Sequence, residues 1–205
     1  EFVFFIWDSG KRELFGARDA IGTRHFYYYS DPQRFGFASE INGLLATGWV
    51  DPQLNETRLL DYLAVQFDRD DEVGTFYQEI YRLPAGHALK VSEGKIRSWR
   101  YWDPANLEAN RFQSIEECAE AFLEQLRGAV KCRLRSIGPV GAMLSGGLDS
   151  SSIVGLVNKE FRDELPEPLH TFSLIREDRE NCVDWQHVQP MLEGDWIKPT
   201  ILTSS

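Results

Sequence analysis

Residues that build disulfide frameworks or metal sites are scarce in this 205-residue sequence. It has three cysteines, Cys118, Cys132 and Cys182, and four scattered histidines. A sparse, odd set of cysteines argues against a disulfide framework and for a reducing compartment, so we expect a cytoplasmic location. No Cys-x-x-Cys pair occurs, and the spacing of cysteine and histidine gives no support for a zinc site.

Long apolar runs and a basic excess are also absent. No run of about 18 apolar residues occurs, so no membrane-spanning helix is expected. The 32 acidic residues outnumber the 22 basic residues, which gives a formal net charge of −10. A general nucleic-acid surface needs the opposite sign. We therefore expect neither a nucleic acid nor a membrane as a partner.

The start of the sequence lacks a signal peptide. It opens on an aromatic, β-branched stretch at residues 2–7, without a basic region, a small-residue cleavage site or an initiator methionine. We expect the chain to be an internal fragment of a longer protein.

The first half, residues 1–104, has the pattern of an α+β unit. It predicts a meander of short strands at 2–7, 13–17, 25–29 and 35–38, helices at 40–47 and 56–66, and a hairpin within 86–102. The acidic run at 68–72 predicts a solvated loop. Residues 105–113 then predict a linker.

The second half, residues 114–205, has the pattern of an α/β unit. A capping box at Ser114 and Glu117 starts a long amphipathic helix. A buried strand at 140–144, a helix and a strand at 170–175 follow, which indicates a parallel sheet. Because no later strand is evident, we expect the 170–175 strand to have an unpaired edge and the isolated unit not to fold cooperatively.

The most informative segment is Ser145-Gly146-Gly147-Leu148-Asp149-Ser150. It joins the 140–144 strand to a helix start. Its glycines permit positive φ and close backbone approach, and its later residues favour a helix N-terminus. Backbone N–H groups at such a terminus attract an anion, so the segment predicts a cradle for phosphate or pyrophosphate. The alternative is a tight turn with capping serines.

Two common nucleotide motifs are missing. The chain has no Gly-x-x-x-x-Gly-Lys-Ser/Thr run and no Gly-x-Gly-x-x-Gly. The segment at 145–150 instead resembles the pyrophosphate loop of the ATP-pyrophosphatase superfamily, whose members adenylate a substrate.

Other segments resemble one family, the glutamine-hydrolysing asparagine synthetases and their relatives. The similar segments are Gly16-Ala17-Arg18-Asp19-Ala20-Ile21-Gly22 with Phe26-Tyr27-Tyr28, Phe37-Ala38-Ser39-Glu40-Ile41, Leu83-Pro84-Ala85-Gly86-His87 and Tyr101-Trp102-Asp103. Ala85 stands where the family has a second proline. The resemblance extends to about residue 175, beyond which the sequence is hard to align.

The resemblance implies both a fold and a chemistry. Residues 1–104 would be the end of an Ntn-hydrolase-type class II glutamine amidotransferase layer, and residues 114–205 the truncated start of a parallel-sheet ATP-pyrophosphatase domain. ATP would activate a carboxylate as an acyl-adenylate, and an amine would then attack. In an asparagine synthetase the carboxylate is aspartate and the amine is ammonia from glutamine.

The resemblance also implies roles for particular residues. ATP would be bound by Leu144, Ser145, Gly146, Gly147, Leu148, Asp149, Ser150 and Leu174. Asp149 would hold Mg²⁺; the alternative is that it is only a helix N-cap. The alternative for Leu144 and Leu174 is plain sheet core. Arg18 and Asp19 are interpreted as a structural ion pair.

Departures from the family leave other functions open. The family's glutaminase nucleophile is an N-terminal cysteine, whereas residue 1 is Glu1. None of the glutaminase residues is present, so we expect no glutamine hydrolysis by this chain. A lasso-peptide or β-lactam cyclase, with a peptide substrate in the first case, is one alternative. An inactive remnant or interaction module is another, and a transfer-RNA-modifying enzyme is disfavoured by the acidity. A homodimer is also considered.

Overall fold

The computed structural model of the chain describes residues 1–64, 71–179 and 181–204. It divides into two compact units, residues 1–109 and 110–205. Both contain helices and strands, as the sequence predicts. Within the described residues no helix is long and apolar enough to cross a membrane. Cys118, Cys132 and Cys182 are free thiols.

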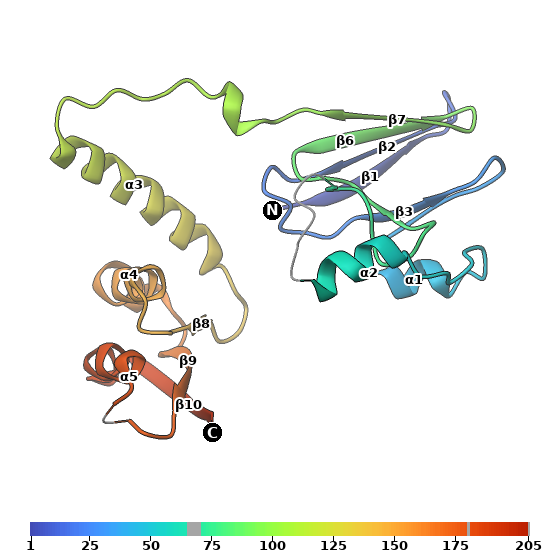
Figure 1. The fold of residues 1–205 in the computed structure, drawn as a ribbon. Coiled ribbons are helices and arrows are strands. Elements are labelled where there is room, and N and C mark those ends of the chain that lie inside the picture. The colour runs from blue at the N-terminus through green and yellow to red at the C-terminus, as the bar shows by residue number, and fades with distance from the viewer. Residues whose placement is uncertain (65–70, 180, 205) are drawn as a thin grey trace. The chain divides into compact units, whose positions relative to one another are not determined.

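Among its described residues, the first unit contains two antiparallel sheets and two short α-helices (Figure 1). The strands of the first sheet lie in the order β1-β2-β6-β7, and those of the second in the order β4-β3-β5. The elements of this unit are β1 (Val3–Asp8), β2 (Glu13–Arg18), β3 (Tyr27–Ser30), β4 (Phe35–Ala38), α1 (Ile41–Leu45), α2 (Glu56–Leu63), β5 (Tyr81–Arg82), β6 (His87–Ser92) and β7 (Lys95–Arg100).

The predicted single meander is wrong. β2 pairs with β6, about 70 residues later in the chain, and β3 pairs with β4 and β5 instead. The alternation of apolar residues identifies strands but not their partners. Phe26, Leu83 and Leu89 form a buried cluster in this unit, so pairing with β6 brings Leu89 to the core.

The helices of the first unit are shorter than predicted. α1 covers Ile41–Leu45 of the predicted 40–47, and Gly48 follows with a φ of +68°. α2 covers Glu56–Leu63 of the predicted 56–66; residues 65 and 66 lie outside the described residues. Of the predicted solvated loop at 68–72, residues 68–70 also lie outside the described residues.

Arg18 and Asp19 are buried and have the structural role that the sequence predicts, but no ion pair within 4 Å joins them, although their opposite charges attract each other. Arg18 donates from three nitrogen atoms to the carbonyls of Arg24, Leu83 and Gly22, at 2.6 to 2.7 Å. Asp19 accepts the amides of Thr23 and Arg24, and more weakly that of Phe2. Backbone groups therefore satisfy both charges, and the two side chains organise the turn between β2 and β3.

The second unit is a parallel sheet with helices (Figure 1). The strand order is β10-β9-β8. Its elements are α3 (Ile115–Arg133), β8 (Gly141–Met143), α4 (Leu148–Leu156), β9 (Leu169–Arg176), α5 (Val183–Val188) and β10 (Ile197–Ser204). Short helical turns cover Val157–Phe161, Arg162–Glu164 and Gln189–Leu192, and one more, Pro104–Asn106, lies in the first unit.

Two expectations for this sheet are wrong. β10 pairs with β9 along its whole length, so β9 is central and has no unpaired edge. The strand at 140–144 is buried only in part: Leu144 is fully buried, but β8 is an edge strand and the side chain of Met143 is 69% exposed. Phe172 and Leu202 are also exposed. Apolar residues thus occupy the open edge and one face of the sheet. A partly buried strand can therefore have the same run of apolar residues as a fully buried one.

The long helix α3 begins as the sequence predicts. The Ser114 hydroxyl accepts the Glu117 amide at 3.1 Å, and the Glu117 carboxylate accepts the Gln113 amide at 2.6 Å. Only its C-terminal half contributes to the core, where Val130 is buried. Phe122 is 67% exposed, so the predicted apolar face is covered only in part.

Candidate nucleotide site

The predicted phosphate loop lies between β8 and α4, at the carboxyl end of β8. The residue that precedes the loop, Leu144, is fully buried. The Leu144 amide donates to the Phe172 carbonyl at 2.9 Å, and the Leu144 carbonyl accepts the buried Ser173 hydroxyl at 2.6 Å. These bonds fix the loop to β9. Since β8 and β9 are parallel, the loop and the end of β9 share the sheet edge at which ligands of such folds bind.

Two serine side chains close the loop on itself. The Ser145 amide donates to the Ser150 hydroxyl at 3.2 Å, and the two hydroxyl oxygens lie 3.1 Å apart. The Ser150 hydroxyl also donates to the Gly147 carbonyl at 3.2 Å. Hydroxyl hydrogens rotate freely, so both groups are donors that a phosphate oxygen can recruit.

Gly146 is the position at which the loop requires glycine. Its φ is +77°, and a Cβ there would lie 2.7 Å from the Asp184 carbonyl oxygen and 3.1 Å from the His187 Cβ. Helix α5 therefore packs against the loop, and its backbone leaves no room for a side chain. The sequence predicted backbone freedom here but not α5, because no motif marks residues 183–188.

Asp149 is not the N-cap of α4. Gly147 holds that position without a side-chain cap, and Asp149 is the exposed second residue of the helix. The interpretation of Asp149 as only a capping residue is therefore wrong. The amides of the first helical turn have no partner within the helix, and the helix dipole favours an anion beside them. A carboxylate in the same turn can hold a cation that accompanies the anion.

The two leucines predicted to line the nucleotide differ in exposure. Leu144 lies in the core, which agrees with the alternative interpretation of this residue as plain sheet core. The Leu174 side chain, in contrast, is 60% exposed near the end of β9. Leu174 pairs with Leu202 of β10. It therefore presents an apolar surface on the sheet, close along β9 to Ser173, which binds the loop.

The residues present fit a magnesium–phosphate complex. The described part of the chain has no group of three His, Cys, Asp or Glu side chains arranged for a metal ion. Mg²⁺ commonly takes one or two carboxylates, several waters and the phosphates of its substrate. A single carboxylate at a helix start, beside a loop whose amides and hydroxyls can bind phosphate, matches that requirement.

Comparison with known families assigns two parts of the chain. The family described as "Glutamine amidotransferase domain" matches residues 1–102. The family described as "Asparagine synthase" matches residues 121–190, which include the phosphate loop, β9 and α5. The order of the two matches along the chain is the one that the sequence motifs indicate.

Curated relatives match along most of the chain. Asparagine synthetase [glutamine-hydrolyzing] 3 of Bacillus subtilis is 32% identical over 96% of the chain and 32% of its own length. A putative asparagine synthetase [glutamine-hydrolyzing] 2 of Methanocaldococcus jannaschii is 35% identical over 84% of the chain and 33% of its own length. Amidase chyE of Penicillium rubens is 35% identical over 77% of the chain and 23% of its own length. The chain spans about a third of the length of the first two relatives.

Proposed function

Because the chain belongs to the family of glutamine-hydrolysing asparagine synthetases, we propose that the whole protein forms amide bonds in an ATP-dependent reaction. Residues 1–104 would be part of its glutamine amidotransferase domain and residues 114–205 part of its ATP-pyrophosphatase domain. The loop from Ser145 to Ser150 carries this proposal. It combines helix-start amides, two serine hydroxyls and one exposed carboxylate at the ligand edge of a parallel sheet.

In this proposal the loop binds the β and γ phosphates of ATP. The amides near Gly146 and Gly147 and the hydroxyls of Ser145 and Ser150 donate to phosphate oxygens. Such donors stabilise the negative charge that develops on pyrophosphate as it leaves. Asp149 would hold Mg²⁺, which when bound neutralises part of the phosphate charge. Exposed Leu174 would pack on the adenine, while Leu144 would hold the loop by its backbone.

The proposed substrates are aspartate and glutamine. The names of the Bacillus subtilis and Methanocaldococcus jannaschii relatives support asparagine synthesis with glutamine as the nitrogen donor. The similarity to a chain named an amidase supports a second candidate, amide chemistry on a different carboxylate. A cytoplasmic location and a homodimer remain predictions of the sequence.

Exchange between ATP and pyrophosphate in the full-length protein tests the role of Asp149. We expect Asp149→Ala to lower the exchange rate at least about a hundredfold, since charge stabilisation at such a site contributes on the order of 3 kcal/mol. Glutaminase activity should persist because it belongs to the other domain. Asp163→Ala, a change of an exposed acid in the same unit, is the control.

The exchange rate of the Asp149→Ala protein can also contradict the proposed role of Asp149. If the Asp149→Ala protein keeps its exchange rate within about tenfold, Asp149 contributes less than ~1.4 kcal/mol to the transition state and does not hold the metal.

A further inference from the structure

A pocket lies in the first unit, and its lining residues come from between Arg18 and Ala85. Its volume is about 390 Å³, within the usual range for small-ligand sites. Two aromatic rings, Tyr62 and Phe76, line it and meet edge to face with centroids 5.6 Å apart. Pro84 and Ala85 add to the apolar lining. None of these residues belongs to the phosphate loop.

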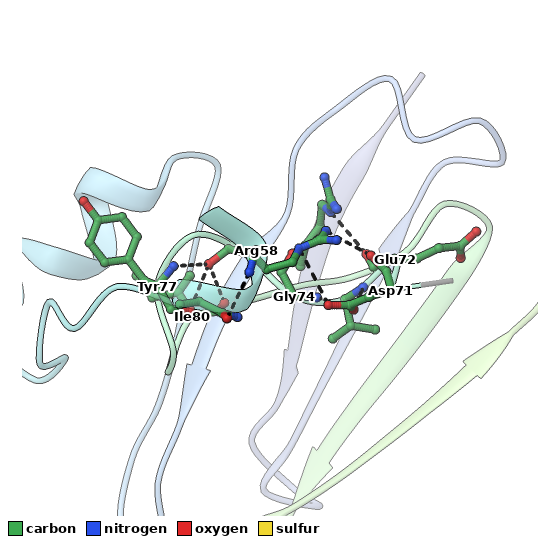
Figure 2. Close-up of polar contacts among 10 residues, drawn as sticks. Arg58, Asp71, Glu72, Gly74, Tyr77 and Ile80 are labelled. Carbon is green, nitrogen blue, oxygen red and sulfur yellow. Dashed lines mark hydrogen bonds and ion pairs between the residues drawn. The ribbon is translucent and has the colours of Figure 1, made fainter. Parts of the chain in front are cut away.

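One wall of the pocket is rigidly built. Arg58 donates to the carbonyls of Asp71 and Gly74 at 3.0 and 3.2 Å, and its guanidinium lies 3.7 Å from the Asp71 carboxylate (Figure 2). The Asp71 carboxylate accepts the Gly74 amide at 2.7 Å, which lowers the pKa of Asp71 below its ordinary value. Glu72 lies 3.8 Å from Arg100. Both acids of this wall therefore already have cationic partners.

Two charged side chains of the pocket, Asp61 and Arg82, form no direct ion pair among the described residues, although the Asp71 carboxylate lies near enough for the charge of Arg82 to lower its pKa. Within the described residues, the Asp61 side chain forms no ion pair or hydrogen bond, and the only hydrogen bond of the Arg82 side chain runs from Nε to the Glu72 carbonyl at 3.2 Å. Asp61 and Arg82 line the same pocket, yet they do not pair with each other. Both are half-buried. A ligand with a positive and a negative end would satisfy both.

The surroundings of Arg82 favour a negative ligand group. Arg18, the third arginine of the pocket, is buried, and its donors already bind carbonyls. Burial lowers the pKa of Arg18, and the nearby positive charge of Arg82 lowers it further. Two guanidinium groups repel each other, and a ligand carboxylate beside Arg82 relieves that repulsion.

We propose that this pocket binds a free L-α-amino acid with an apolar side chain. Its carboxylate binds the Arg82 guanidinium, its ammonium group binds the Asp61 carboxylate, and its side chain packs on Tyr62, Phe76 and Pro84. A metal ion is a poorer match, because the acids of the described residues form no cluster arranged for one. None of its residues belongs to the phosphate loop, so an amino acid bound there would be a regulatory ligand.

Calorimetric titration of the protein with L-phenylalanine and L-leucine tests the proposal. Saturable binding to one site per chain is expected for at least one of them. The N-acetyl and methyl ester derivatives each lack one charge, and we expect each to bind about tenfold more weakly or worse. These analogues need no mutation, so they test the charge requirement on the unaltered protein. Equal affinity for the N-acetyl form or the ester would overturn the proposal, as would the absence of saturable binding by both amino acids.

Substitutions then test the two residues. Arg82→Gln and Asp61→Asn should each weaken binding about tenfold or more. Arg97→Gln and Asp163→Asn, which do not line the pocket, should leave it unchanged. Circular dichroism checks the folding of each variant, and the analogue titrations on the unaltered protein carry the test if a variant does not fold. Wild-type affinity in both pocket variants would show that these charges do not hold the ligand.

Discussion

At the residue scale, close packing and positive φ determine which residue types the phosphate loop can contain. Gly146 meets both constraints at once, since its φ is +77° and the Asp184 carbonyl occupies the space of a Cβ. A flexible side chain could move away from an added Cβ, but the atom in contact here is a backbone oxygen at the start of α5. Replacing this glycine must therefore shift either the loop or the helix.

We expect Gly146→Ala to destabilise the second unit by about 2–3 kcal/mol, the sum of left-handed strain and overpacking. Gly128→Ala is the matched control. Gly128 lies in α3, and no neighbouring atom lies within 4 Å of the place that its methyl group would take, so this replacement should be neutral or stabilising. Urea unfolding followed by tryptophan fluorescence measures both. Equal stability of the Gly146 and Gly128 variants would contradict the packing of α5 on the loop.

Asp19 should make the stability of the first unit depend on pH. Burial alone would raise its pKa, but the amides of Thr23, Arg24 and Phe2 lower it from 3.8 to about 2. Because the folded pKa is below the unfolded one, the carboxylate stabilises the fold above about pH 4, and this contribution is lost as pH falls toward 2.

The measurement is chemical unfolding between about pH 2.5 and pH 6 with the Asp19→Asn variant as comparison. We expect the variant to be less stable at pH 6 by about 2 kcal/mol, in line with hydrogen bonds to a charged group. Its stability should also fall less steeply below about pH 4. Parallel curves for the two proteins would contradict the role assigned to these amide bonds.

At the element scale, β9 organises the second unit. Every second residue of this strand is buried, namely Leu169, Thr171, Ser173 and Ile175. Two of these four carry hydroxyls. The Ser173 hydroxyl binds the Leu144 carbonyl, whereas the Thr171 hydroxyl has no partner among the described residues. The two hydroxyls lie on the same strand face but should make opposite contributions to stability.

We expect Ser173→Ala to cost about 1 kcal/mol, because the Leu144 carbonyl loses its 2.6 Å bond. Thr171→Val should be neutral or stabilising by up to about 1 kcal/mol, since it removes a buried hydroxyl without a hydrogen bond. Thermal unfolding of both variants decides the matter. A large loss of stability in Thr171→Val would mean that its hydroxyl has a partner after all, such as a buried water.

At the scale of the whole molecule, each unit has its own core. The buried clusters around Leu89 and Ile80 belong to residues 1–109, and the cluster around Leu144 belongs to residues 110–205. Residues 104–117, which span the boundary of the two units, are exposed throughout. Because β10 completes the pairing of β9, the expectation that the second unit cannot fold alone loses its physical reason.

Limited proteolysis tests this division. Exposed connecting segments are preferred cleavage sites, so trypsin should cut after Arg111 and release two fragments, residues 1–111 and 112–205. Arg111→Gln should remove this pair of products and leave other cuts unchanged. Mass spectrometry identifies the products. If neither fragment accumulates from the wild-type protein, the segment around Arg111 is protected from trypsin, which would contradict the division into two units.

The local features of this chain were determined by the sequence alone. The capping box at Ser114, the loop from Ser145 to Ser150 and most strand positions depend on neighbouring residues, whose backbone preferences and hydrogen bonds act over a few positions. The family resemblance was likewise carried by short motifs, and the matches to residues 1–102 and 121–190 confirm it.

Tertiary structure alone decided the contacts between distant segments. β2 pairs with β6, β9 with β10, and α5 lies against Gly146, and none of these partners is marked by a local pattern. Apolar alternation shows that a strand has a buried face, but many strands of one chain satisfy that condition equally. Which partner is chosen depends on how all the apolar faces are buried together, and that is a property of the complete fold.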